Sequence, residues 1–150
     1  MTAFDHIGLS VGDLDTAVAW YVEALGLVAT EPFAVPSVGV RGQFVVDPHD
    51  HWAIELLERA GSDGGIRATS APEAMLTRGF GHICLRVPSV DAVYERLVAA
   101  GASERMSPCE SPEPGVRMAF VADPEGNLIE LHDRAGHAGS ASFEGETSHV

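Results

Sequence analysis

The sequence is poor in cysteine, in positive charge and in long apolar runs. Its 150 residues include two cysteines, Cys84 and Cys109, which are too few for a disulfide framework and predict a reducing, cytoplasmic setting. Nine Lys and Arg side chains against 22 Asp and Glu give a formal charge of −13, which excludes nucleic acid and anionic membranes as expected partners. No apolar run approaches ~18 residues, and no basic-then-apolar signal pattern opens the chain, so we expect neither membrane insertion nor secretion.

An internal repeat is the main feature that the sequence does contain. The repeat covers three pairs of segments: residues 6–11 and 82–87, 39–48 and 115–124, and 54–56 and 129–131. The middle pair shares the pattern GVRxxFVxDP, and the last pair reads Ile-Glu-Leu in both copies. Most of the repeat is offset by 76 positions, as from His6 to His82. Because a module of about 60 residues is marginal alone, the two copies should share a core.

Each half of the repeat predicts the same order of elements, a strand, a helix and three further strands. In the first half, Asp13 is the expected N-cap of a helix from Leu14 to Leu25, and Gly26 ends it. Trp20 and Tyr21 fall on the inward stripe of this helix and are expected in the core. The other predicted elements are strands at 4–11, 27–31, 40–46 and 52–58, then a strand at 81–87, a helix at 90–100 and strands at 103–107, 116–122 and 128–133.

The repeat also predicts how the chain is divided. Residues 1–58 form the first module and residues 80–133 the second, within one domain overall. Residues 59–79 lack periodicity and join the two modules. A connection of this length allows the modules of one chain to pair with each other, or to be exchanged between two chains. Residues 134–150 are rich in Gly, Ser and Ala and are expected to be a disordered tail.

Strand alternation gives the repeat its predicted chemistry. Glu55 and Glu130 point away from their Ile and Leu neighbours, into the hollow that His6 and His82 also face. A lone inward His or Glu is usually a structural polar group. Four such residues at equivalent places of a repeat are hard to explain as structural polar groups, because burying an unpaired carboxylate costs free energy. Two imidazoles and two carboxylates suit a divalent metal such as Ni, Zn, Co, Mn or Fe. Such a centre favours a substrate that becomes anionic during the reaction.

Several other side chains are candidates for a role near the site. Arg86 lies on the face of His82 and is either the cation for an acidic small-molecule substrate or the partner of a nearby acidic residue. His132 shares the face of Glu130 and is either a donor to it or a surface residue. The remaining residues of this kind are expected to be architectural, solvated or in the tail: Arg41 and Arg117, Phe44 and Phe120, His49 and His51, His137 and His149.

The chain resembles the vicinal oxygen chelate superfamily, which includes glyoxalase I, methylmalonyl-CoA epimerase, extradiol dioxygenases and bleomycin-binding proteins. The residues that carry the likeness lie at 5–14, 20–27, 81–83 and 120–131. This resemblance implies an α+β fold in which two βαβββ modules form a cup-shaped cleft around a metal.

The order His6, Glu55, His82, Glu130 is most similar to that of glyoxalase I. It implies a metal-dependent lyase or isomerase that moves a proton next to a metal-bound carbonyl through an enediolate. Glu130 is the first choice for the base, and Glu55 is the other candidate.

The same likeness implies a homodimer with sites between subunits. It does not extend to Ser10, which stands where glyoxalase I typically has an Arg for the glutathione part of its substrate. Arg86 holds the equivalent place in the second half.

Two alternative functions stay open. One is an isomerase similar to methylmalonyl-CoA epimerase, which commonly has Gln in place of Glu55, and the other is a protein that sequesters a small molecule, as bleomycin-resistance proteins do.

Overall fold

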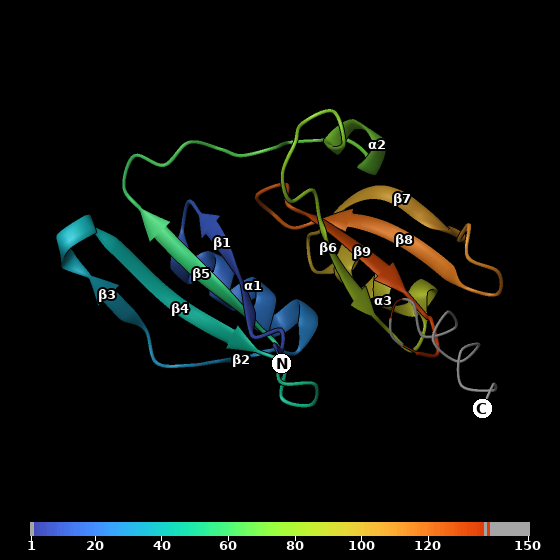
Figure 1. Cartoon of the computed structure of the whole chain (residues 1–150), viewed down its shortest axis with the longest axis horizontal. Coiled ribbons are helices and arrows are strands. Elements are labelled where there is room, and N and C mark those ends of the chain that lie inside the picture. Colours follow the sequence, from blue (N-terminus) through green and yellow to red (C-terminus); the bar gives the residue numbers. More distant parts are fainter. Residues whose placement is uncertain (1, 137, 139–150) are drawn as a thin grey trace, which may run out of the picture.

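The computed structural model describes residues 2–136 and 138 and contains two separate β-sheets with one long helix packed on each (Figure 1). The first module consists of β1 (His6–Val11), α1 (Leu14–Leu25), β2 (Val28–Ala29), β3 (Phe33–Val35), the 3-10 turn η1 (Pro36–Val38), β4 (Val40–Val46) and β5 (Ala53–Arg59). The second consists of β6 (Ile83–Arg86), α3 (Val90–Ala99), β7 (Ser103–Glu110), β8 (Arg117–Ala122) and β9 (Leu128–His132), and the short helix α2 (Ala71–Ala74) lies between the modules. The predicted α+β fold of two βαβββ modules is confirmed.

The two sheets share one topology. The first has the order β1-β5-β4-β2, with β3 also paired to β4, and the second has the order β6-β9-β8-β7. In each sheet the first strand of the module pairs in parallel with the last, and the remaining pairs are antiparallel. The parallel pair is what places the His-bearing segment of each module beside the strand that carries its Glu.

Local sequence signals fix where the two long helices begin and end. The Asp13 side chain accepts a hydrogen bond from the Thr16 backbone N–H at 2.8 Å, and Ser89 caps α3 in the same way through the Ala92 N–H. Gly26 ends α1 at a φ of 71°, a left-handed conformation that glycine adopts without strain. The structure therefore confirms the predicted limits of α1.

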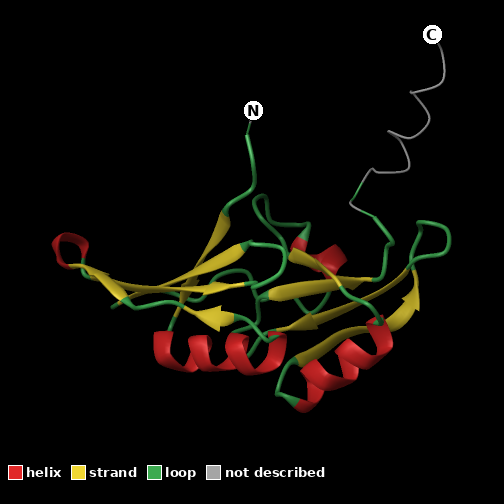
Figure 2. Cartoon of the chain, turned by 90° about the horizontal axis from the view of Figure 1, so that it is seen from below, coloured by secondary structure: helices red, strands yellow, loops and turns green. Residues whose placement is uncertain are grey.

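Both long helices pack on the same side of the two sheets, as Figure 2 shows. One continuous hydrophobic core joins them, and it includes fully buried residues of both modules, such as Leu14, Ile54, Leu97 and Ile129. Trp20 and Tyr21 belong to this core, as predicted. Neither long helix covers the opposite face of either sheet, which is the face on which the predicted metal ligands lie; in the second module the short helix α2 packs on part of it, through Ala74 against Ala122 and Leu128.

The structure adds elements that the sequence pattern missed. The predicted joining segment contains α2, whose first N–H groups are capped by Ser70, and β3 and η1 lie between the predicted second and third strands. β7 continues to Glu110, three residues past its predicted end. The predicted disordered tail lies mostly outside the described residues, as do His137 and His149.

None of the helices in the described part of the chain has the length and apolar character needed to cross a membrane.

Three sets of hydrogen bonds join the modules around the shared core. The Tyr21 hydroxyl donates to Oδ2 of Asp123 at 2.8 Å, and the Trp20 indole donates to the Ala100 carbonyl at 2.9 Å. The Glu125 carboxylate accepts from the Gly12 backbone N–H at 2.8 and 3.0 Å, just before α1 begins. Burial, and then the charge of Asp123, raises the pKa of Tyr21 well above its usual value, so the phenol stays protonated as a donor.

We predict that Tyr21→Phe lowers the free energy of unfolding by about 1–2 kcal/mol, because it removes a donor from a buried carboxylate. Tyr94→Phe is the matched control. The Tyr94 hydroxyl is also buried but has no hydrogen-bond partner among the described residues, so its loss should be close to neutral. Urea denaturation of both variants measures the difference, and equal losses would show that the Tyr21–Asp123 bond does not stabilise the junction.

Candidate metal and active site

The first module brings His6 and Glu55 together on the helix-free face of its sheet. Glu55 lies opposite Gly8 in the parallel β1–β5 pair, and its Oε2 is 3.6 Å from Nε2 of His6. The other ring nitrogen of His6, Nδ1, contacts Oδ1 of Asp5 at 2.6 Å. The edge of the imidazole meets Phe44, with ring centroids 5.3 Å apart and planes at 84°. The ring is thus held on two sides with Nε2 directed at the carboxylate.

The second module repeats this arrangement. Glu130 lies opposite Cys84 in the β6–β9 pair, and its Oε2 is 3.1 Å from Nε2 of His82. The His82 ring meets Phe120 with centroids 5.3 Å apart and planes at 80°. Phe44 and Phe120, which the sequence analysis assigned to architecture, therefore support the two histidines. This His–Phe pairing was not predicted; the offset of 76 that relates both His6 to His82 and Phe44 to Phe120 is the sequence signal that could have indicated it.

Glu130 has more polar neighbours than Glu55. Nε2 of the buried His132 lies 3.2 Å from Oε1 of Glu130. Of the two roles predicted for His132, a donor to Glu130 or a surface residue, the structure favours the donor. Burial raises the pKa of the Cys84 thiol to about 12, and the adjacent Glu130 adds to the shift, so Cys84 is a neutral thiol at physiological pH. Cys84 was not among the residues predicted for the site, although strand alternation places it on the face of His82.

The four predicted ligands occur as two separate pairs within one chain. Among residues 2–136 and 138, no group of three or more His, Cys, Asp or Glu side chains is placed to hold a metal ion. The donor set still fits a divalent metal, because each pair presents one imidazole nitrogen and one carboxylate oxygen on a supported strand face. The Asp5 contact to His6 is of the kind that orients metal-bound histidines.

The three arginines considered from the sequence, Arg41, Arg86 and Arg117, each have an acidic neighbour. Arg41 contacts Asp15 at 3.0 Å, and Arg117 contacts Asp91 at 2.8 Å, so each ties a strand to the first turn of the helix in its own module. This agrees with the architectural role expected from the repeat. Arg86 lies 3.8 Å from Asp50, and both side chains are partly exposed, so this ion pair is weak.

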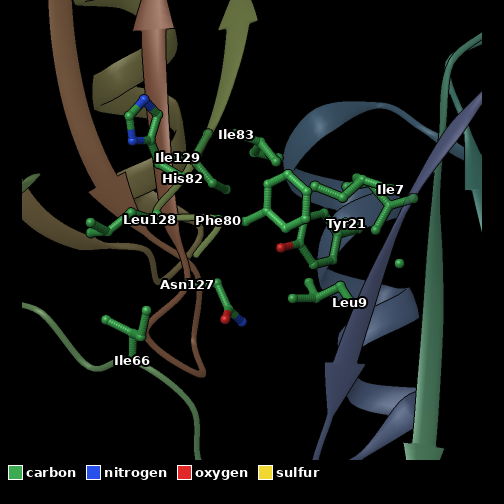
Figure 3. A pocket seen from close by; sticks show the side chains of 13 residues that line it. Ile7, Leu9, Tyr21, Ile66, Phe80, His82, Ile83, Asn127, Leu128 and Ile129 are labelled. Atoms are coloured by element: carbon green, nitrogen blue, oxygen red, sulfur yellow. The ribbon is translucent and has the colours of Figure 1, made fainter. Parts of the chain in front are cut away.

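An apolar cavity of about 240 Å³ lies between the modules beside His82 (Figure 3). Ile7 and Leu9 of β1 form one wall, and Ile129 of β9 lies on the other side. Phe80 borders the cavity from the segment before β6, although its own surface is 92% exposed. Of the four predicted ligands only His82 borders this cavity, and its ring points away from it in Figure 3.

The duplicated module and its paired His and Glu side chains define a protein of the vicinal oxygen chelate type. The chain belongs to the Glyoxalase/Bleomycin resistance protein/Dioxygenase superfamily, whose family model matches residues 3–131.

Named relatives of the chain fall into two groups. It is 28% identical to a probable chloroplastic lactoylglutathione lyase of Arabidopsis thaliana over 86% of its own length, but spans 35% of that protein. A probable lactoylglutathione lyase of Synechocystis is also 28% identical, with 84% of this chain and 91% of the relative covered. An ethylmalonyl-CoA/methylmalonyl-CoA epimerase of Cereibacter sphaeroides is 34% identical, with 65% of this chain and 70% of the relative covered.

Among solved structures, glyoxalase I from Zea mays is similar, with a TM-score of 0.71 and 26% identity. The match covers 89% of this chain and 45% of the maize chain. The chain therefore spans less than half the length of the plant proteins that it matches.

Proposed function

We propose that this protein is a metal-dependent lyase or isomerase of glyoxalase I type that acts on a small-molecule carbonyl substrate. The observation that carries the proposal is the duplicated His/Glu pair, with His6 and Glu55 in one module and His82 and Glu130 in the other in matching surroundings. The relatives named lactoylglutathione lyase support the same reaction class. The two free cysteines support a cytoplasmic location.

The proposed centre contains His6, Glu55, His82 and Glu130 around one divalent metal, which is Ni, Zn, Co, Mn or Fe. When bound, the metal supplies Lewis acidity to a carbonyl oxygen of the substrate. Glu130 removes the proton from the neighbouring carbon and returns it to the adjacent position. His132 restrains Oε1 of Glu130, which leaves the other oxygen on the side of His82. Glu55 has no second contact of this kind among the described side chains, and we assign it to metal binding first.

We further propose a homodimer in which each site combines the first module of one chain, residues 1–58, with the second module, residues 80–133, of the other. Two observations support this arrangement. Within one chain the ligands lie as two pairs, and the junction between its modules is fastened by buried hydrogen bonds such as Tyr21 to Asp123. The joining segment 59–79 then links two half-sites that belong to different metal centres.

The experiment that tests the proposed function starts from protein stripped of metal with a chelator. Metal is added back, and the protein is incubated in D₂O with a thiohemiacetal, an α-hydroxyketone and a 2-methyl-acyl thioester. We expect metal-dependent conversion of the thiohemiacetal, with solvent deuterium next to its carbonyl. The absence of turnover and exchange with every metal would contradict the proposal.

The second candidate function is epimerisation of a 2-methyl-acyl thioester, which the Cereibacter sphaeroides relative favours. It uses the same proton transfer, and exchange into the thioester alone would identify it. Tight ligand binding that is indifferent to chelator, without any turnover, would instead identify a sequestering protein.

A further inference from the structure

The junction between the modules has two dissimilar ends. One end is the apolar cavity of about 240 Å³ beside Tyr21 and Asn127. The other is a larger cleft of about 840 Å³ beside the start of β1 and the end of β6. The walls of the larger cleft are partly apolar, with side chains from both modules: Phe4, Leu25, Leu27, Trp52, Leu85 and Val93.

Two polar contacts close the smaller end. The Tyr21 hydroxyl reaches Asp123, and the Glu125 carboxylate accepts from the Gly12 N–H. Both contacts join the 123–127 turn of the second module to the first module, one to α1 and the other to the segment just before it.

The repeat shows why the larger end stays open. Leu97 occupies the place of Tyr21, 76 positions later, and has no hydroxyl to donate. Pro88 occupies the place of Gly12 and has no backbone N–H. His49 stands where Glu125 would be expected, in a turn that is one residue longer. Neither contact of the closed end can therefore form here.

Arginine side chains gather in this open cleft, although the chain as a whole carries a formal charge of −13. Three of its nine basic residues, Arg86, Arg96 and Arg134, line the cleft together with Asp47 and Asp50.

The partners of these charges differ. Arg134 is paired with Glu113, and the Asp47 carboxylate accepts from the backbone N–H of Asp50 at 2.6 Å. Arg96 has no ion-pair partner in the described part of the chain, and Arg86 contacts Asp50 only at 3.8 Å. Two guanidinium groups thus remain able to bind an anion.

We propose that this cleft binds a small organic anion, a carboxylate or phosphate attached to an apolar body. Arg86 and Arg96 bind the anionic group, since guanidinium forks match the oxygens of carboxylate and phosphate. The apolar body packs against side chains such as Trp52 and Leu27. The cleft also reaches Cys84 and His132 beside Glu130, so the inference extends the proposed function by naming the chemical class of its ligand. No arginine here needs a metal, so binding can be tested in metal-free protein separately from turnover.

The test uses three probes of one shape, 2-naphthoate, 2-naphthyl phosphate and the neutral 2-naphthylmethanol, titrated calorimetrically into metal-free wild-type protein. We expect at least one acid to bind and the alcohol to bind about tenfold more weakly or worse. Arg86→Gln and Arg96→Gln should each weaken binding of that acid by about tenfold. The tighter acid identifies the anionic group.

Arg78→Gln is the matched control, because it removes the same charge from an exposed position in the joining segment that does not line the cleft. It should bind the acids as wild type does. All three arginines are on the surface, and thermal melting of each variant verifies folding. Equal binding of the alcohol and the acids, equal losses in all three variants, or no binding of either acid would each overturn the proposal.

Discussion

Glu130→Gln should lower kcat by about 10²–10⁴-fold, because the amide keeps the shape of the side chain but cannot accept the transferred proton. The change should act mainly on kcat and less on KM, since the variant still offers an oxygen to His132 and to the substrate site. Steady-state kinetics on the thiohemiacetal, with metal content measured in every sample, separates lost proton transfer from lost metal.

Two controls make this result specific. Glu95→Gln makes the same chemical change at an exposed position of α3 and should leave kcat unchanged. Glu55→Gln should weaken metal binding but retain more turnover than Glu130→Gln at saturating metal. The reverse order, with Glu55→Gln the more damaging at equal metal content, would assign the base to Glu55.

The asymmetry between the two carboxylates explains why Glu130 is the expected base. His132 lies beside Glu130, whereas the equivalent place in the first module is Leu57, which offers no polar contact to Glu55. Cys84 likewise has Gly8 as its counterpart. A carboxylate contacted from two sides is held in one orientation, which proton transfer requires and metal binding alone does not.

Much of the fold could be predicted because its signals are local. The limits of α1 follow from Asp13 and Gly26, and the inward or outward direction of Glu55 follows from strand alternation. The short helix α2 was missed, since four residues are too few to show a helical period. β3 has three residues and was missed for the same reason.

The packing of the two modules could not be predicted, because it depends on contacts between distant residues. The Tyr21–Asp123 bond joins residues 102 positions apart, and no sequence pattern marks the pair. The direction in which each of the four ligands points could be predicted, but their grouping into two separate pairs could not. Alternation fixes the direction of a side chain within one sheet, whereas the distance between two sheets depends on how whole modules meet.

Restoration of activity in mixed dimers is the second large effect that we expect. His6→Ala and Glu130→Ala should each be inactive as homodimers, because every site then lacks one ligand. After subunit exchange, a mixed dimer contains one site built from the intact first module of the Glu130→Ala chain and the intact second module of the His6→Ala chain. An equal mixture with random exchange should therefore recover about a quarter of wild-type activity.

A mixture of His6→Ala with Glu55→Ala is the matched control for this complementation. Both substitutions lie in the first module, so every site of the mixed dimer still contains one damaged half and no activity should return. Exchange is verified by native mass spectrometry of chains that differ in isotope label. If exchange is complete and the His6→Ala with Glu130→Ala mixture stays inactive, the four ligands of each site must come from a single chain. The modules of that chain would then have to move from the packing that Tyr21 and Glu125 fasten here.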